Sequence, residues 1–369
     1  MERTKEPTRD YAALAAGSWE LWDTLYARRS HRKYLPAMLD EALLGELEDF
    51  VRLAASVRGV DRERLLVVAD PERVEEIKRR AHKGATQKIN LWLSRSPLMG
   101  FLALVLPLQD LAEERPRELP RAVMAAEDCV LWLTERGIGT CWLGGINHAE
   151  IREVLGLGEG LTTPALISFG RPKPRIKARD YDHLVYHTLS RHRKPLSAIA
   201  YRESMKVPFQ AGGPAVAELE VCENQEVAGL LKSIPERAVS DERVPLELTL
   251  EACLEAARIA PSASNAQRWR FVAVTDAEKL AGLREHCGTG VPWRAAVVGL
   301  GREGAWEYTI FEKHFWVIDL PIAFSHMTLM AASMCLAADM VLEGFQEEEI
   351  GRLVEREAGY KVAGVMGIR

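Results

Sequence analysis

The sequence lacks three features that would assign it to a membrane or secreted class of protein. Its longest apolar run, residues 97–108, is shorter than the ~20 residues that a spanning helix needs, and so it predicts a buried strand or core segment. Residues 1–10 are charged and contain no apolar stretch of a secretory signal. The 6 cysteines show no CxxC spacing, which favours free thiols in a reducing compartment. These absences predict a soluble cytoplasmic protein.

Neither sign of charge is in excess. The 48 Lys and Arg residues against 53 Asp and Glu residues leave a net charge of -5, which provides no global field to attract nucleic acid. Aromatic and basic residues also do not alternate as they do along a nucleic-acid groove. A length of 369 residues with 47% hydrophobic residues excludes wholesale disorder and predicts two domains or one large domain.

The two halves of the chain share one plan. The string LLVVADPERVEEI, which ends at Ile77, returns as FVAVTDAEKLAGL. ELPRAVMAAEDCVLWL, which begins at Glu118, returns as DLPIAFSHMTLMAASM, and PALISFGR returns as AGVMGIR at the C-terminus. The members of each pair lie about 200 residues apart and in the same order, which indicates duplication. We predict a first copy with a C-terminal arm at residues 20–201, and a second, degenerate copy at residues 202–369.

Each copy predicts a helix, a strand, further helices and closing strands, which together make an α+β fold. Amphipathic spacing predicts helices at residues 40–55 and 246–260. Residues 121–135 and 322–340 are apolar almost all round, which is typical of helices buried between other elements. Residues 171–245 are too apolar in places for a free linker, and they predict an extended arm packed across the other copy.

Two cationic strings are suited to binding an anion. The first holds three guanidinium groups and a hydroxyl, on Arg28, Arg29, Ser30 and Arg32, and the second contains Arg191 and Arg193. Arginine forks match phosphate oxygens well. The alternative for both strings is a solvated basic surface.

Two further strings are suited to binding a flat polar ligand. In GIGTCWLGG, Gly137 predicts a helix cap, while Gly144 and Gly145 let backbone N–H groups approach a ligand. In APSASNAQRW, small hydroxyls and two amides provide neutral donors and acceptors for a heterocycle. The alternative for the second string is an Asx-type cap and turn, with Trp269 in the core.

The strings RRSHRKY, APSASNAQRW, GIGTCWLGG and ISFGRP, with a buried helix opening at ELP or DLP, resemble the FMN-dependent nitroreductase family, present twice. The resemblance covers most of the chain beyond the first ~20 residues. It implies a nitroreductase-like mixed sheet flanked by helices in each copy, and a monomeric intramolecular pseudo-dimer in place of the family's usual homodimer. It also implies FMN as cofactor, NADH or NADPH as electron donor, and a nitroaromatic, quinone or similar small molecule as acceptor.

The resemblance also implies roles for particular residues. The FMN phosphate and ribityl end would be held by Arg28, Ser30 and Arg32, with Arg29 between them, and the phosphate site would be completed by Arg191 and Arg193. Asn90 would touch the isoalloxazine, and Gly144 and Gly145 would present N–H groups near flavin N5 and O4. The second copy would supply Pro261, Ser262, Ser264, Asn265 and Gln267.

The two copies do not retain the same strings. At the place of residues 28–32 the second copy has Glu236, and a carboxylate repels a phosphate. The first copy has lost the amides of residues 261–267, while the second has residues 335–339 near the place of the GIGT loop and no arm of its own. Suppose that each site combines the arginine string, glycine loop and arm of one copy with the amide loop of the other. All the missing strings then belong to one site, and all the retained strings belong to the other. We therefore predict one live FMN site and one abandoned site.

Other interpretations remain open from the sequence. The chain could be a non-enzymatic flavin-binding or regulatory protein derived from a nitroreductase, or it could catalyse another flavin reaction. His183 and His187 could share a helix face as metal ligands, but suitable partners are missing apart from Asp180 and Asp182, and we expect no metal. Cys141 could be a reactive thiol, although a buried structural cysteine fits better. Residues 58–64 predict a charged loop or a charged surface face.

Overall fold

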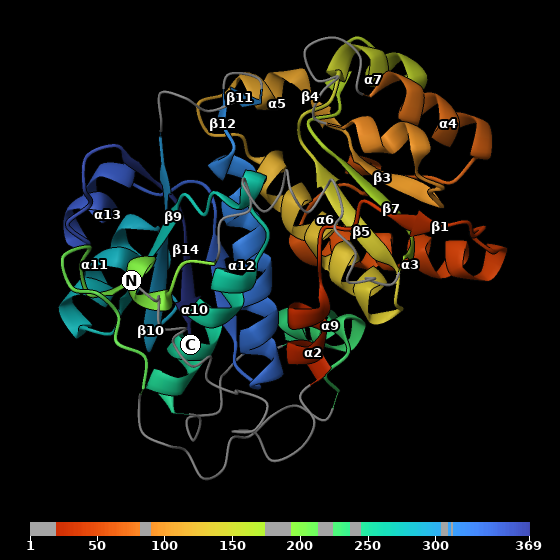
Figure 1. The fold of residues 1–369 in the computed structure, drawn as a ribbon. Coiled ribbons are helices and arrows are strands. Elements are labelled where there is room, and N and C mark those ends of the chain that lie inside the picture. The colour runs from red at the N-terminus through yellow and green to blue at the C-terminus, as the bar shows by residue number, and fades with distance from the viewer. Residues whose placement is uncertain are drawn as a thin grey trace, which may run out of the picture. The chain divides into compact units, whose positions relative to one another are not determined.

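The computed structural model describes residues 20–81, 90–173, 193–212, 224–236, 245–303, 309–310 and 313–369 (Figure 1). The chain forms two compact units. The first-copy unit comprises Ala27–Ser190 and Glu307–Pro321, and the second-copy unit comprises Met1–Tyr26, Arg191–Trp306 and Ile322–Arg369. These units are defined by contacts within the structure, whereas the boundary that we predict between residues 201 and 202 separates the two repeats of the sequence. That boundary stays a prediction.

Four antiparallel strands form the centre of the first-copy unit. Their order is β2 (Leu65–Val68), β3 (Gly100–Leu104), β7 (Leu166–Pro172) and β5 (Gly139–Leu143). The short strand β1 (Tyr34–Leu35) also pairs with β7, and β4 (Leu106–Pro107) pairs with β6 (Leu161–Thr162). All residues of β3 are buried, which confirms the interpretation of the apolar run at residues 97–108.

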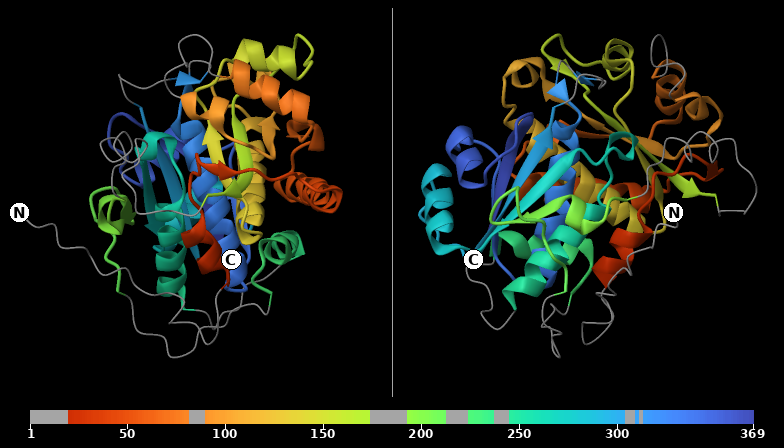
Figure 2. Two further views of the ribbon diagram at one scale, coloured as in Figure 1. Left: turned by 45° about the vertical axis from the view of Figure 1, so that its right-hand side comes forward. Right: turned by 60° about the vertical axis from the view of Figure 1, so that its left-hand side comes forward.

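Helices cover both faces of this sheet. Helices α4 (Pro71–Arg80) and α7 (His148–Val154) share an apolar core with β3, β5 and β7, whereas α3 (Glu41–Arg58) and α6 (Glu118–Glu135) pack together on the other face (Figure 2). Local chemistry sets the bounds of α3, because the Asp40 side chain accepts a hydrogen bond from Leu43 N at its start and Gly59 adopts φ 67° at its end. A shorter helix, α5 (Leu108–Ala112), precedes α6.

The second-copy unit repeats this arrangement. Its antiparallel strands lie in the order β9 (Trp269–Val274), β10 (Ala295–Arg302), β14 (Tyr360–Ile368) and β13 (Ala338–Val341), which correspond in turn to β2, β3, β7 and β5. Helices α11 (Ala277–His286) and α13 (Glu347–Leu353) share the core on one face of this sheet. The duplicated α+β fold that the sequence predicts is therefore confirmed.

The remaining helices of the second copy follow the same order along the chain. The helix α10 (Leu246–Ile259) corresponds to α3, and α12 (Trp316–Ser333) corresponds to α6. The helix α9 (Val227–Glu236) precedes α10 as α2 (Glu20–Ala27) precedes α3, and a small pair of strands joins β11 (Thr309–Ile310) to β12 (Lys313–His314). None of the helices in the described parts of the chain is long and apolar enough to cross a membrane.

Part of the arm packs against the second copy, as we expected, and it adds a strand to the sheet of that copy. Strand β8 (Ala200–Arg202) pairs in parallel with β9, with Ala200 opposite Phe271. Ile199 and Ala200 are fully buried, so this part of the arm belongs to the core of the second-copy unit.

The predicted helix at residues 322–340 is wrong at its C-terminal end. The helix α12 stops at Ser333, because Cys335 adopts a left-handed conformation with φ 54° and its N–H bonds to Ala332 O. Gly137, with φ 69°, ends α6 through the matching bond to Thr134 O. Apolar composition continues from α12 into β13, so composition alone could not locate this boundary.

The expectation of free thiols is wrong for Cys335 and for the cysteine bonded to it. Cys335 is disulfide-bonded. Cys129, Cys141, Cys253 and Cys287 are free and buried, as we expected.

Residues 58–64 are not simply a charged surface loop. Arg58 is the last residue of α3 and is 7% exposed, and its guanidinium bonds both carboxylate oxygens of Asp128 on α6, at 2.7 and 2.9 Å. A bidentate ion pair therefore joins the two helices behind the sheet.

Replacing Asp128 with Ala should lower the free energy of unfolding by about 3–5 kcal/mol, because it leaves the Arg58 charge buried without its partner. Urea unfolding followed by circular dichroism measures this. The control is Asp49→Ala. It removes the exposed ion pair between Asp49 and Arg52, both on α3, and should change the free energy of unfolding by less than about 1 kcal/mol. Equal losses in the two variants would contradict the account.

Candidate functional site

The arginine string lies along the edge of the strand that leads into the glycine turn. Ser30 forms a parallel bridge with Thr140 of β5, and His31 N donates to Thr140 O at 2.8 Å. The Ser30 hydroxyl also bonds the thiol of Cys141. Because β5 ends at Leu143, directly before Gly144 and Gly145, the first-copy unit brings two of the predicted strings together.

Arg28 is the buried cation of this string. It is 6% exposed, and its Nε atom has no hydrogen-bond partner among the described residues. Burial lowers the pKa of Arg28, and the negative charge of Glu127 opposes that shift. Arg29 is exposed and donates from its guanidinium to Arg28 O at 2.9 Å. A buried guanidinium N–H without a partner is chemically suited to an anionic oxygen, so these residues fit a phosphate group.

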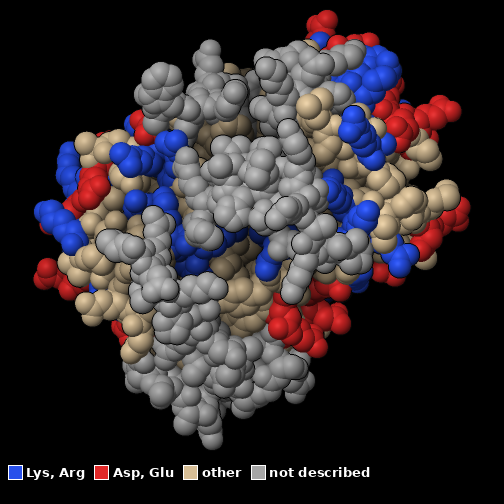
Figure 3. Space-filling view, viewed as in Figure 1, with Lys and Arg blue, Asp and Glu red and all other residues tan. Residues whose placement is uncertain are grey.

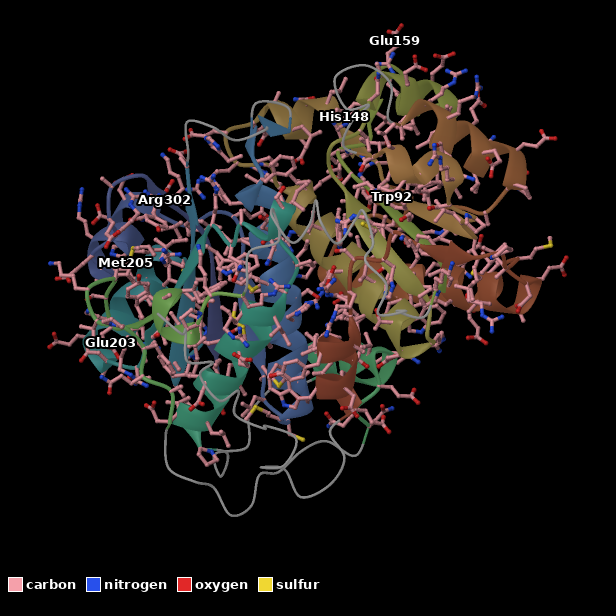
Figure 4. The ribbon with its side chains drawn as sticks, viewed as in Figure 1. Trp92, His148, Glu159, Glu203, Met205 and Arg302 are labelled. Carbon is pink, nitrogen blue, oxygen red and sulfur yellow. The ribbon has the colours of Figure 1, made fainter. Side chains whose placement is uncertain are left out.

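Several side chains hold the backbone of this string in place. The Tyr34 hydroxyl donates to His31 O at 2.7 Å and lies 3.3 Å from the hydroxyl of Ser168 on β7. The Ser96 hydroxyl lies within hydrogen-bond distance of two carbonyls, Trp92 O at 2.9 Å and Arg32 O at 3.3 Å. Trp92, which is labelled in Figure 4, stacks on Tyr34 with 6.2 Å between ring centroids.

The glycine turn is supported at both ends. Trp142 Nε1 donates to Glu127 Oε2 at 2.7 Å, and Asn90 Nδ2 donates to Gly145 O at 2.7 Å. Glu127 is fully buried on α6, and Asn90 is 5% exposed. Asn90 thus contacts the predicted glycine turn directly. Sequence reasoning missed Glu127, and the one available signal was the pair of carboxylates, Glu127 and Asp128, in the middle of a mainly apolar helix.

The amide loop of the second copy has a strained backbone. Ser264, Asn265 and Gln267 all adopt positive φ angles, of 50°, 49° and 50°. Such conformations are costly for residues other than glycine and cluster at ligand sites. Ser264 is exposed, whereas Gln267 and Trp269 are fully buried, which confirms the core position of Trp269. Pro261 is buried and Ser262 is half-buried, and the hydroxyl of Ser262 accepts from Gln267 N at 3.0 Å.

The arm contacts this loop directly. Arg193 donates from both terminal nitrogens to the carbonyls of Ile259 and Ala260, and Lys194 bonds Gln267. Arg191 lies outside the described residues, as do His183, His187 and the carboxylates near them. In the parts of the chain that the structure describes, no group of His, Cys, Asp and Glu side chains could hold a metal ion.

The corresponding edge of the second copy is built differently. After β13 the chain runs through Leu342, Glu343 and Gly344, so a carboxylate stands in the turn that the first copy makes with two glycines. Asp339 on β13 forms an ion pair with Arg369 and accepts from Trp293 Nε1 at 2.9 Å. The guanidinium group at this edge, that of Arg369, is therefore paired with a carboxylate of the same unit.

Surface charge is mixed where the space-filling view shows α4 and α7. Lys and Arg side chains stand beside Asp and Glu side chains there (Figure 3), and Arg80 lies 2.8 Å from Glu76 and 3.2 Å from Glu150. These cations are therefore used in surface ion pairs, in contrast to the buried Arg28.

Comparison with known proteins identifies the family. The model of the nitroreductase family matches residues 25–171 and 232–309, which is more than half of the chain. The chain therefore belongs to the nitroreductase family. No curated protein matches it.

Solved structures of similar proteins include three nitroreductase relatives. A proposed nitroreductase from Thermotoga maritima MSB8 is 16% identical, covers 94% of this chain and 92% of its own, and gives a TM-score of 0.43. An FMN-dependent nitroreductase from Clostridium difficile R20291 is 22% identical over 44% of this chain and 94% of its own, with a TM-score of 0.34. A nitroreductase family protein from Clostridium novyi NT is 21% identical over 42% of this chain and 86% of its own, with a TM-score of 0.35.

Native protein at pH 8 should leave Cys129, Cys141 and Cys253 unmodified by iodoacetamide. Burial raises the pKa of each thiol, to about 12 for Cys253, so the reactive thiolate forms only at higher pH. Mass-spectrometric mapping checks this, with protein unfolded in urea as the reactive control. Modification of Cys141 in folded protein at the unfolded rate would show that it is an accessible, reactive thiol instead.

Proposed function

We propose that the chain is an FMN-dependent NAD(P)H oxidoreductase of the nitroreductase or quinone-reductase type. The observation that carries the proposal is the buried Arg28, whose Nε lacks a partner among the described residues, on a segment paired with the strand that leads into the glycine turn. Membership of the nitroreductase family supports a redox function, and a related structure is described as FMN-dependent.

In this proposal the chain binds and orients, and bound FMN supplies the redox chemistry by passing electrons from NADH or NADPH to an acceptor. Arg28, Arg29, Ser30 and Arg32 hold the phosphate end. The turn at Gly144 and Gly145 presents backbone N–H groups to the ring, and Asn90 supports that turn through Gly145 O. The acceptor is a small molecule such as a nitroaromatic or a quinone.

We further propose one FMN per chain, with Pro261, Ser262, Ser264, Asn265 and Gln267 completing the site. The support is the distribution of strings, because only the first copy keeps the arginine string and glycine turn and only the second keeps the amide loop. The loop at residues 260–268 is also longer than its counterpart at residues 59–64. A monomer in the cytoplasm is the simplest setting, although the disulfide of Cys335 is unusual for that compartment.

Anaerobic titration of the purified yellow protein with NADH and, separately, with NADPH tests the activity. The visible absorbance of the flavin should bleach with at least one donor and return when a quinone or nitroaromatic is added. A flavin spectrum that ignores both donors would contradict the proposal and favour a non-enzymatic flavin-binding or regulatory protein.

Replacing both Arg28 and Arg32 with Met should weaken FMN binding by about 1.5–3 kcal/mol for each lost charge-assisted contact. Riboflavin, which lacks the phosphate, should bind the variant about as well as it binds the unaltered protein. Fluorescence titration of the apoprotein with each flavin measures both affinities. The matched control replaces the exposed Arg52 and Arg117, and FMN affinity equal to that of this control would refute the phosphate assignment.

A further inference from the structure

The arm holds the end of α10, where the amide loop begins. Both terminal nitrogens of Arg193 donate to backbone carbonyls there, one to Ala260 O and the other to Ile259 O at 2.9 Å. These carbonyls belong to the last turn of the helix, whose carbonyl groups have no partners within the helix. Arg258, on that same turn, donates to Lys194 O at 3.4 Å, so the contact runs in both directions.

The next residue of the arm holds the far end of the loop. Lys194 N donates to Gln267 Oε1 at 2.7 Å, and Lys194 Nζ donates to Gln267 O at 2.8 Å. Gln267 in turn donates from Nε2 to Asn265 O at 3.1 Å. Two consecutive arm residues therefore fasten the loop at Ile259–Ala260 on one side and at Gln267 on the other.

The backbone between these two points needs such support. Three of its residues, Ser264, Asn265 and Gln267, have positive φ angles that are unfavourable without glycine. Strained conformations of this kind persist only where surrounding contacts determine them. Hydrogen bonds from the arm supply those contacts, because they bind main-chain atoms of the loop and the Gln267 side chain within the second-copy unit.

We infer that Arg193 and Lys194 are positioning residues that keep the Ser264–Asn265 turn in its left-handed conformation for flavin binding. The inference rests on the proposed function for its ligand. It gives Arg193 a different role from the phosphate contact that the family resemblance implies, since its two terminal nitrogens bond the carbonyls of Ile259 and Ala260, where the loop begins. Loss of the arm contacts then affects recognition of the flavin ring, which FMN and riboflavin share.

The test compares Arg193→Met with the unaltered full chain in binding FMN and riboflavin. A positioning role predicts that both affinities fall by a similar factor, about tenfold, because the variant loses two hydrogen bonds that hold the loop. Arg193→Lys should recover part of the loss, since an ammonium group can still bond a carbonyl. Adding Asn265→Ala to Arg193→Met should cause little further loss, because the two changes disable the same contact.

A second measurement needs no flavin. Hydrogen exchange of backbone amides at residues 262–267 in the apoprotein should be faster in Arg193→Met and in Lys194→Met, with the fold retained by circular dichroism. The matched control is Arg270→Met, because Arg270 also donates to a backbone carbonyl, that of Trp269 at 2.7 Å, but lies outside the loop. Exchange in this control should equal that of the unaltered protein.

Two results would overturn the inference. One is a fall in FMN affinity with riboflavin affinity unchanged, which would make Arg193 a phosphate ligand. The other is unchanged loop exchange in both arm variants. Failure of the unaltered chain to bind either flavin would instead refute the proposed function, and the exchange measurement would still decide whether the arm holds the loop.

Discussion

The pairing of residues 28–32 with the edge of β5 is the contact on which the candidate site depends. One backbone hydrogen bond, from His31 N to Thr140 O, sets the register of this pairing. The register places the Ser30 hydroxyl at the thiol of Cys141. Arg28, two residues before Ser30, is buried. Glu127 interacts with both the glycine turn and the arginine string. It accepts a hydrogen bond from Trp142, and its negative charge stabilises the buried positive charge of Arg28. The cation can thus remain buried without an exposed counterion.

The second copy has the same architecture, but the corresponding strand edge carries an internal ion pair. Arg369 N donates to Ala337 O, beside β13, and the Arg369 guanidinium pairs with Asp339. The end of α12 also keeps the left-handed turn of its counterpart, although Cys335 replaces Gly137 there. The backbone geometry at this turn is therefore the same in the two copies, although the side chains differ. The strained loop at Ser264 is the feature that the second copy retains and the first lacks.

Much of the fold could be predicted from the sequence, because its signals are local. Asp40 and Asp70 cap helices through their own side chains, and the β-branched and apolar run of β2 returns in β9. The boundary at Ser333 was missed because apolar composition continues past it. Contacts between residues far apart along the chain were missed for a different reason, because they produce no periodic pattern in the sequence. Examples are the bonds of Arg58 to Asp128 and of Lys194 to Gln267. The candidate strings were visible, but the carboxylate of Glu127 that supports them was not.

The central claim is that one chain has one competent phosphate anchor, in its first copy. The measurement that tests it most directly is the ratio of released flavin to protein in the fully loaded, purified protein, from absorbance after denaturation and amino-acid analysis. The account predicts a ratio of about one, because among the described residues the first copy has a buried cation, Arg28, near its glycine turn, whereas the second has Asp339 and Glu343 at the corresponding edge. A ratio near two would show that the acidic edge of the second copy also binds FMN, and would contradict the account.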